Sequence, residues 1–211
     1  MDSIIAIPHQ HGVTSLDLHQ FTSSEREEIL FAFCFAQRVH NGQYRKTGEP
    51  FITHPVEVAN ILLNELWPQL GISITKEEVI TALIHDSIED SDLDITAIKI
   101  LFGETVAHLI NLLTKKWLYL YFDQLTREVY DQLDLSEQKR YLQVLKPQLK
   151  PLQLLDYYQW ISTDPRAVRI KRADKRHNHS TLHIMGEEKM KEELNETKVY
   201  FNKLINESIL Y

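Results

Sequence analysis

The chain has 211 residues, and its 23 Lys and Arg residues against 30 Asp and Glu residues give a formal net charge of −7 at pH 7. Hydrophobic residues make up 43% and charged residues 25%, which is typical of a folded globular domain and excludes disordered, collagen-like and fibrous coiled-coil chains. The acidic balance argues against a general nucleic-acid binder, because nothing draws the whole molecule towards polyphosphate. The single cysteine, Cys34, excludes a disulfide framework and a cysteine-based zinc site.

The N-terminal segment carries no targeting signal that we recognise. It lacks a basic stretch followed by an apolar stretch of signal-peptide length. Apolar runs elsewhere are interrupted by charge and are shorter than the roughly 20 residues of a membrane span. We therefore expect a cytoplasmic protein without a membrane or nucleic-acid partner.

The first 40 residues predict an irregular segment followed by a helix. Residues 1–20 show no periodic apolar face, so we expect an irregular N-terminal lead-in. Ser24 followed by Glu27 is a capping-box pattern, and apolar residues continue at helical spacing to about His40. No strand alternation of useful length is evident.

Helix signals continue through the middle of the chain. Pro55 stands where the first turn of a helix accepts proline. Thr75 with Glu78 forms a second capping box, and Asp94 can cap a further helix. Gly103 is expected to end that helix, and another helix should follow it.

The last third predicts helices on both sides of an unusual segment. Residues 116–162 are rich in aromatic residues and punctuated by proline, with one helix expected near residues 126–145. Pro165 should begin a long helix, and residues 187–208 a last amphipathic helix. The fold class is therefore all-α. We expect one domain over residues 21–211, in which residues 116–162 are a helical or irregular insertion. Packing or a homodimer contact is favoured for this insertion over a substrate lid.

Four titratable residues stand together within a largely apolar helix. His85 and Asp86 are adjacent, so both can reach one ion only near a helix end or at a bend. Glu89 and Asp90 follow three and four residues after Asp86 and return to nearly the same face. So many polar groups are costly on a core-facing helix, which favours a functional role.

Two further segments add polar side chains of matching chemistry. Asp174, Asn178 and Thr181 form one polar stripe on the helix that Pro165 begins. His54 stands immediately before a helix-starting proline and follows a basic loop, residues 45–46. The run 166–176 holds six cations, of which helical geometry lets only one or two reach such a site.

Two imidazoles and two carboxylates from three helices suit a borderline divalent ion such as Mn²⁺, Fe²⁺ or Zn²⁺. Each residue taken alone has a simpler interpretation. Asp86 can cap a helix, His85 can be a hydrogen-bonded core histidine, and Asp174 can pair with a neighbouring Lys or Arg. The three segments together favour the metal site.

Four segments resemble, in order and spacing, the motifs of the hydrolase domain of RelA/SpoT-type alarmone enzymes, which belong to the HD superfamily. They are RVHNGQYRKTGEPFITHP, ALIHDSIEDSD, FGETVAHLINLLTK and IKRADKRHNHSTL. The resemblance implies a helical HD domain and a Mn²⁺-dependent pyrophosphohydrolase that removes the 3′-diphosphate of (p)ppGpp, with a part in the stringent response. Because little chain follows the last motif, we expect a stand-alone small alarmone hydrolase without a synthetase domain.

The resemblance also implies a role for each matching residue. The metal ligands would be His54, His85, Asp86 and Asp174. Glu89 and Asp90 match the pair that activates water and transfers protons. The positions beside the nucleotide base and phosphates are Arg45, Lys46, Asn178 and Thr181.

Departures from the family pattern leave the base preference open. Arg172 stands where the family usually has leucine, and Ser91 replaces a frequent threonine. One alternative is the same fold acting on another phosphorylated nucleotide, such as (p)ppApp or a 2′-phosphate dinucleotide. Another is an HD module that binds nucleotide without turnover, although such modules normally lack a ligand or the acidic pair.

Overall fold

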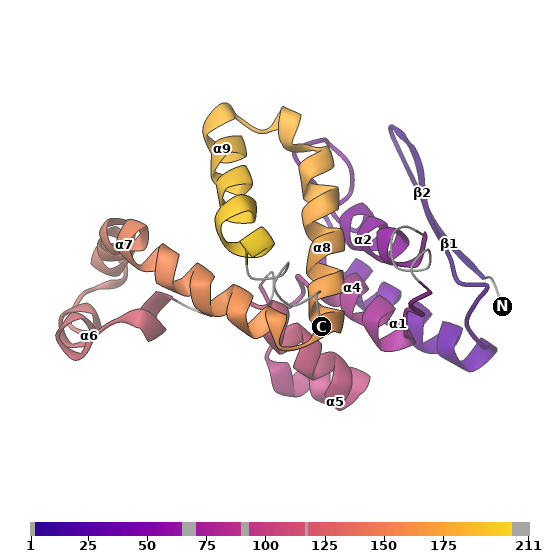
Figure 1. The fold of residues 1–211 in the computed structure, drawn as a ribbon, viewed down its shortest axis with the longest axis horizontal. Coiled ribbons are helices and arrows are strands. Elements are labelled where there is room, and N and C mark those ends of the chain that lie inside the picture. Colours follow the sequence, from indigo (N-terminus) through magenta and orange to yellow (C-terminus); the bar gives the residue numbers. More distant parts are fainter. Residues whose placement is uncertain (1–2, 65–70, 90–92, 117, 204–211) are drawn as a thin grey trace.

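The computed structural model describes residues 3–64, 71–89, 93–116 and 118–203. Its centre is a group of packed helices, α1 (Ser23–Val39), α2 (Thr53–Asn64), α4 (Lys76–Ile84) and α8 (Pro165–Ser180) (Figure 1). Helix α2 packs against both α4 and α8, and α1 packs against α4. The buried side chains between them include Ile29, Val56, Leu62, Leu83 and Ile170. The all-α class predicted from the sequence is confirmed.

Side-chain caps set the beginnings of these helices. Helix α1 begins at a capping box of Thr22 and Glu25, two residues before the predicted pair. Thr75 and Glu78 form the predicted box at α4. Both arrangements satisfy backbone N–H groups that a helix leaves unpaired at its start.

Helix α5 (Ile95–Leu113) is capped by Asp94, as the sequence predicts, and is divided at Gly103. Gly103 has φ 86°, a left-handed conformation in which only glycine is unstrained. Within the described residues, α5 is the one helix long and apolar enough to cross a membrane, by length and composition alone. One face of α5, which includes Ile98, Val106 and Leu109, is buried in the hydrophobic core.

The irregular lead-in predicted for residues 1–20 is wrong, because β1 (Ile4–His9) and β2 (Gly12–Asp17) form an antiparallel hairpin. Ile5 pairs with Leu16, and both side chains are buried. Each strand contributes only a few inward side chains, too short an alternation to be recognised alone. The hairpin packs on α2, and this packing supplies the stability that an isolated two-stranded sheet lacks.

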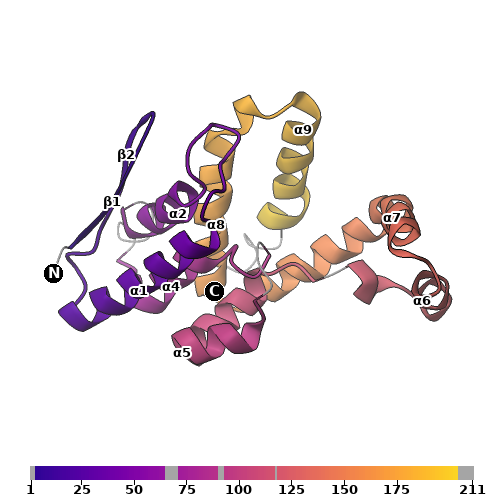
Figure 2. The same ribbon diagram turned by 180° about the vertical axis from the view of Figure 1, so that it is seen from behind.

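The insertion is also more regular than predicted. It contains η1 (Leu118–Tyr121), α6 (Gln124–Asp131) and the long α7 (Leu135–Ser162) instead of one helix near residues 126–145. Pro147 and Pro151 lie inside α7, one turn apart, and both are exposed. Helix α6 and the first half of α7 project from the body in both views (Figures 1 and 2).

The C-terminal region folds back along the insertion. Helix α9 (Glu187–Glu196) continues into a π-helical segment, Thr197–Phe201, which contacts α7. The predicted last helix over residues 187–208 is therefore confirmed as far as residue 203, and its final residues lie outside the described part of the chain. Phe201 and Tyr158 pack together at this contact.

Candidate active site

The four ligands predicted from the sequence lie at one point between helices. His54 is in the first turn of α2, His85 is the C-cap of α4, Asp86 follows it, and Asp174 is near the middle of α8. His54 Nε2 lies 3.3 Å from Asp174 Oδ1 and 3.6 Å from Asp86 Oδ2. His85 Nε2 lies 3.2 Å from Asp86 Oδ1 and 3.7 Å from Asp174 Oδ1. Two imidazole nitrogens therefore face two carboxylates.

The end of α4 explains how adjacent residues reach the same point. The helix stops at Ile84, and residues 86–89 form turns. Asp86 is thus released from the helical spacing that would turn it about 100° from His85. The apolar residues of α4 remain in the core, and only the polar end of the helix enters the site.

Backbone contacts orient the His85 ring. Its Nδ1 donates to the carbonyl of Ala82 at 2.8 Å, which leaves Nε2 without a proton in the neutral ring. This Nε2 is buried and has no hydrogen-bond partner in the described part of the structure. In the neutral ring, the lone pair of this buried Nε2 is directed at two carboxylates, which is the arrangement that a metal ligand requires.

The carboxylates of Asp86 and Asp174 make the centre of the cluster favourable for a positive ion. Burial alone would lower the pKa of His85, but the carboxylates of Asp86 and Asp174 raise it to about 9. Burial outweighs the same carboxylates at His54 and lowers its pKa. Burial would raise the pKa of Asp174, yet the Lys171 ammonium and the two histidines hold it well below its ordinary value.

His54, His85 and Asp174 each offer a ligand atom within 4.8 Å of the others. Together with Asp86 they form a mixed nitrogen and oxygen set that fits a borderline divalent ion. A bound cation would supply the positive charge that the cluster otherwise obtains by protonating His85. The residues present therefore fit a divalent metal.

Two side chains on α8 that the sequence pattern did not assign to the site contact the predicted ligands. Lys171 Nζ lies 2.7 Å from Asp174 Oδ2. His177 Nδ1 lies 2.7 Å from His54 Nδ1, and burial, His54 and Arg45 lower the pKa of His177 to about 3. Both residues stand three positions from Asp174, so the helical spacing that placed Asn178 beside the site could also have indicated them.

Three other cations of the run 166–176 pair with acidic residues outside the predicted ligand cluster. Arg166 pairs with Asp164, the N-cap of α8, and Arg169 pairs with the buried Glu78. Lys175 pairs with Glu193 and Glu196 of α9. Among these residues, only Lys171 reaches the ligand cluster, which agrees with the expectation that one or two would.

A pocket of about 340 Å³ opens over the ligands. Its lining is Tyr44, Arg45, Lys46, Phe51, His54, Asp86, Lys171, Asp174, Asn178 and Met185. This lining combines aromatic and apolar surface with cations, the chemistry that a phosphorylated nucleotide requires. Asn178 Nδ2 donates to Asp174 Oδ1 at 2.7 Å, so it joins the pocket to the ligand cluster.

A tight turn presents the basic pair to this pocket. Gly48 N–H donates to the Arg45 carbonyl at 2.9 Å, and Gly48 has φ 86°. The positive φ favours glycine here, whereas a Cβ would meet only the movable end of the Gln10 side chain, at 2.4 Å from its Nε2. Arg45 Nη2 donates to Thr181 Oγ1 at 3.3 Å, which anchors the guanidinium to the end of α8.

The acidic pair is only partly described. Glu89 is exposed in the turns after α4, and its Oε1 accepts a hydrogen bond from the backbone N–H of Lys115 at 3.1 Å. It is not among the described residues that line the pocket. Asp90 lies outside the described residues.

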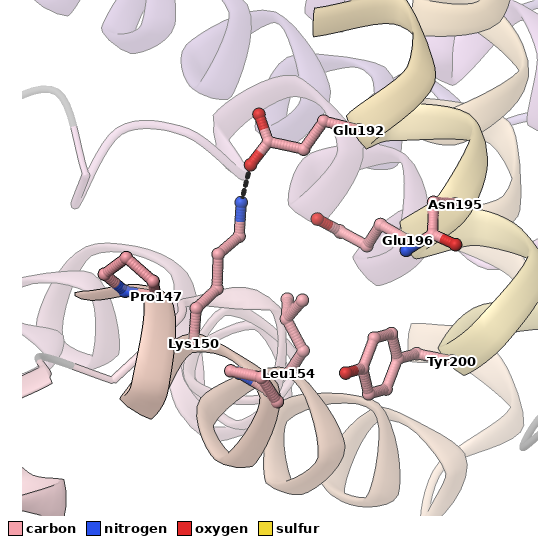
Figure 3. Close-up of a pocket in the computed structure, with 8 residues that line it drawn as sticks. Pro147, Lys150, Leu154, Glu192, Asn195, Glu196 and Tyr200 are labelled. Atoms are coloured by element: carbon pink, nitrogen blue, oxygen red, sulfur yellow. Dashed lines mark hydrogen bonds and ion pairs between the residues drawn. The ribbon is translucent and has the colours of Figure 1, made fainter. Parts of the chain in front are cut away.

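A second cavity, of about 200 Å³, lies between α7 and α9 and has different chemistry (Figure 3). Lys150 of α7 extends towards Glu192 of α9 and pairs with it across the opening. Glu196 is buried there but already bonded to Tyr158 and Lys175. No histidine is among the described residues that line this second cavity, so the cavity lacks the metal-binding chemistry of the pocket over His54.

A family model described as the HD domain matches residues 32–207 of this chain. The chain belongs to the HD-domain family. The match includes all four predicted ligands and extends across the insertion, so α6 and α7 lie within the region that the HD domain model covers.

Two curated relatives of this HD domain are informative. It is 30% identical over 199 residues to a GTP pyrophosphokinase of Myxococcus xanthus, covering 94% of this chain and 23% of that protein. It is 35% identical over 171 residues to a guanosine-3′,5′-bis(diphosphate) 3′-pyrophosphohydrolase of Aquifex aeolicus. This match covers 81% of this chain and 20% of that protein. The chain therefore spans about a fifth of the length of these relatives.

A solved structure of a metazoan orthologue of SpoT, described as hydrolysing ppGpp, superposes on this HD domain with a TM-score of 0.55. The alignment covers 90% of this chain and 96% of that one, at 21% sequence identity. At that identity the likeness establishes a shared fold.

Proposed function

We propose that this HD domain hydrolyses the 3′-diphosphate of (p)ppGpp, which yields GDP or GTP and pyrophosphate. One observation carries the proposal: His54, His85, Asp86 and Asp174 converge at the base of a pocket that Arg45 and Lys46 also line. A metal-binding cluster beside paired cations suits a substrate with concentrated negative charge. The similarity to the guanosine-3′,5′-bis(diphosphate) 3′-pyrophosphohydrolase of Aquifex aeolicus supports the same reaction.

The residues have distinct parts in this proposal. A bound divalent metal would supply an acidified water as the nucleophile. Arg45 would hold the nucleotide through planar or bidentate contacts, and Lys46 would contribute a point charge to the phosphates. Asn178 and Thr181, which contact Asp174 and Arg45, would position the nucleotide.

Proton transfer is assigned to the acidic pair. Glu89 lies three residues after Asp86, and its carboxylate is exposed. We propose that Glu89 and Asp90 accept the proton of the attacking water and return one to the leaving group. The cation is proposed to be Mn²⁺, because two imidazoles and two carboxylates suit a borderline divalent ion.

The proposal is tested by incubating the purified protein with ppGpp and Mn²⁺ and measuring GDP and pyrophosphate. Asp86→Ala is the control, because it removes a ligand whose side chain is partly exposed. Release of pyrophosphate by the wild type and not by the variant is expected. Bound metal and bound nucleotide without any turnover would overturn the hydrolase proposal in favour of a binding module.

The same assay compares substrates. We expect ppGpp to be cleaved faster than ppApp or a dinucleotide 2′-phosphate. If either of these were cleaved faster than ppGpp, the proposal of a metal-dependent hydrolase would stand and its proposed substrate would be wrong.

Residues 21–211 are proposed to form one domain that acts in the cytoplasm. The homodimer contact expected of residues 116–162 also stays a proposal. The exposed Leu125, Leu135 and Val144 on α6 and α7 support it. Light scattering of the purified protein tests it, and a monomer at micromolar concentration would contradict it.

A further inference from the structure

His54 has a nitrogen on each side of its ring, and the two nitrogens face different surroundings. Its Nε2 faces Asp86 and Asp174, whereas its Nδ1 lies 2.7 Å from Nδ1 of His177. The planes of the two rings differ by 29°, so an N–H bond on one ring can point close to the plane that holds the lone pair of the other. One proton must lie between the two nitrogens, and the distance alone does not show which ring carries it.

Arg45 identifies the ring that carries this proton. Its Nη1 lies 3.3 Å from the same Nδ1 of His177. A guanidinium can only donate hydrogen bonds, so Nδ1 of His177 must accept. A proton on that nitrogen would face the Arg45 N–H group directly. The shared proton therefore belongs to Nδ1 of His54.

The position of this proton determines which atom of His54 can bind a metal. In a neutral imidazole only one nitrogen is protonated, so a proton on Nδ1 leaves Nε2 with a free lone pair. That lone pair faces the carboxylates of Asp86 and Asp174. A proton on Nε2 would instead block coordination and require rearrangement before a metal could bind.

We propose that His177 is a positioning residue for the metal centre, which accepts the Nδ1 proton of His54 while Arg45 holds His177 in the accepting form. The inference rests on the metal site of the proposed function and adds a second task for Arg45. The usual outer partner of a metal-bound histidine is a carboxylate or a backbone carbonyl. Here a neutral histidine takes that place, and a cation on a different segment of the chain fixes its tautomer.

The first experiment reads the tautomer in the metal-free protein. Nitrogen-15 NMR of the imidazole side chains distinguishes protonated from unprotonated ring nitrogens. We expect His54 of the wild type to be protonated at Nδ1 alone. In His177→Leu, which removes the acceptor, both tautomers should appear, and His177→Gln should restore the single form because an amide oxygen accepts. A single Nδ1-protonated form in His177→Leu would overturn the proposal.

The second experiment measures Mn²⁺ affinity by calorimetry without nucleotide. His177→Leu should weaken binding by about 10- to 100-fold, the usual effect of losing an outer partner. His177→Gln should recover most of the loss. His179→Leu is the matched control, because His179 lies on the same helix and contacts Thr197 instead of the ligands. Thermal unfolding of each metal-free variant verifies that the fold is retained.

Arg45 and Lys46 provide a test with opposite expectations. Arg45→Met and Lys46→Met each remove one positive charge, which by itself favours binding of a divalent cation. Arg45→Met should nevertheless weaken Mn²⁺ binding, because His177 is no longer held as an acceptor, whereas Lys46→Met should not. Equal affinities in the two variants would overturn the role of Arg45. Failure of the wild type to bind any divalent metal would refute the proposed function. The tautomer measurement would still show whether His177 accepts the Nδ1 proton of His54.

Discussion

Glu196, at the end of α9, is a buried carboxylate that contacts both α7 and α8, and removal of its charge should destabilise the protein measurably. Glu196 has a side chain that is 7% exposed. It accepts a hydrogen bond from the Tyr158 hydroxyl at 2.6 Å and lies 3.0 Å from Lys175 Nζ and 3.6 Å from Lys115 Nζ. Glu196→Gln keeps the size of the side chain and removes its charge.

The magnitude follows from the pKa of Glu196. Burial would raise this pKa, but Lys115, Lys175 and the Tyr158 hydroxyl lower it from 4.5 to about 2. A tenfold change in proton affinity is about 1.4 kcal/mol, so this carboxylate contributes about 3 kcal/mol to the free energy of unfolding. The contribution is present above pH 4.5 and is lost as the pH falls from 4.5 towards 2, because the folded state then binds the proton less readily than the unfolded state.

Urea denaturation of the wild type and of Glu196→Gln, at pH 7 and at pH 3, measures this contribution. We expect a loss of about 3 kcal/mol at pH 7 and a smaller difference at pH 3, where the wild type has lost part of the same contribution. Glu192→Gln is the control on the same helix. Its side chain is 58% exposed and pairs with Lys150 at the surface, so the loss should be below about 1 kcal/mol.

Two results would refute this reasoning. A loss below about 1 kcal/mol at pH 7 would mean that the buried charge is not stabilised by its neighbours. A loss of equal size at both pH values would show that packing, and not ionisation, causes it.

Other predictions concern the site and the hairpin. His54→Ala should lose bound metal together with activity, as measured by elemental analysis, and full metal content in an inactive variant would contradict its role as a ligand. Glu89→Gln should keep the metal and lower kcat by about 10²- to 10⁴-fold, and a wild-type rate would refute proton transfer by this residue. Leu16→Ala should lower the free energy of unfolding by about 2–5 kcal/mol, because Leu16 is fully buried under the hairpin. Val13→Ala, at a side chain that is 62% exposed, should have little effect, and equal losses in urea denaturation would show that the hairpin does not pack as described.

Local signals in the sequence were sufficient to predict most of the helices. The capping box at Thr75, the N-cap at Asp94 and the proline at the start of α8 act within one turn of the chain. Interactions of this kind require no tertiary contact, which is why they can be read directly from residue order.

The two errors in the fold arose where burial is decided by distant segments. The hairpin of β1 and β2 is held by packing on α2, far along the chain. Helix α7 continues through Pro147 and Pro151 because both prolines face solvent, and sequence alone does not show which face of a helix is exposed. In both cases the local pattern was compatible with more than one structure.

The sequence by itself also determined the chemical inventory of the site, two imidazoles and two carboxylates, because residue types and motif spacing need no coordinates. The tertiary structure alone decided how these groups are held. Lys171 contacts Asp174, while His177 contacts His54, although 123 positions separate the two histidines. The contact between His54 and His177 depends on the packing of α2 against α8, and periodicity along α8 does not show which residue of α2 it meets. The net charge of −7 likewise argues against a long polyanion as partner, whereas the fold places Arg45, Lys46 and Lys171 in the lining of one pocket.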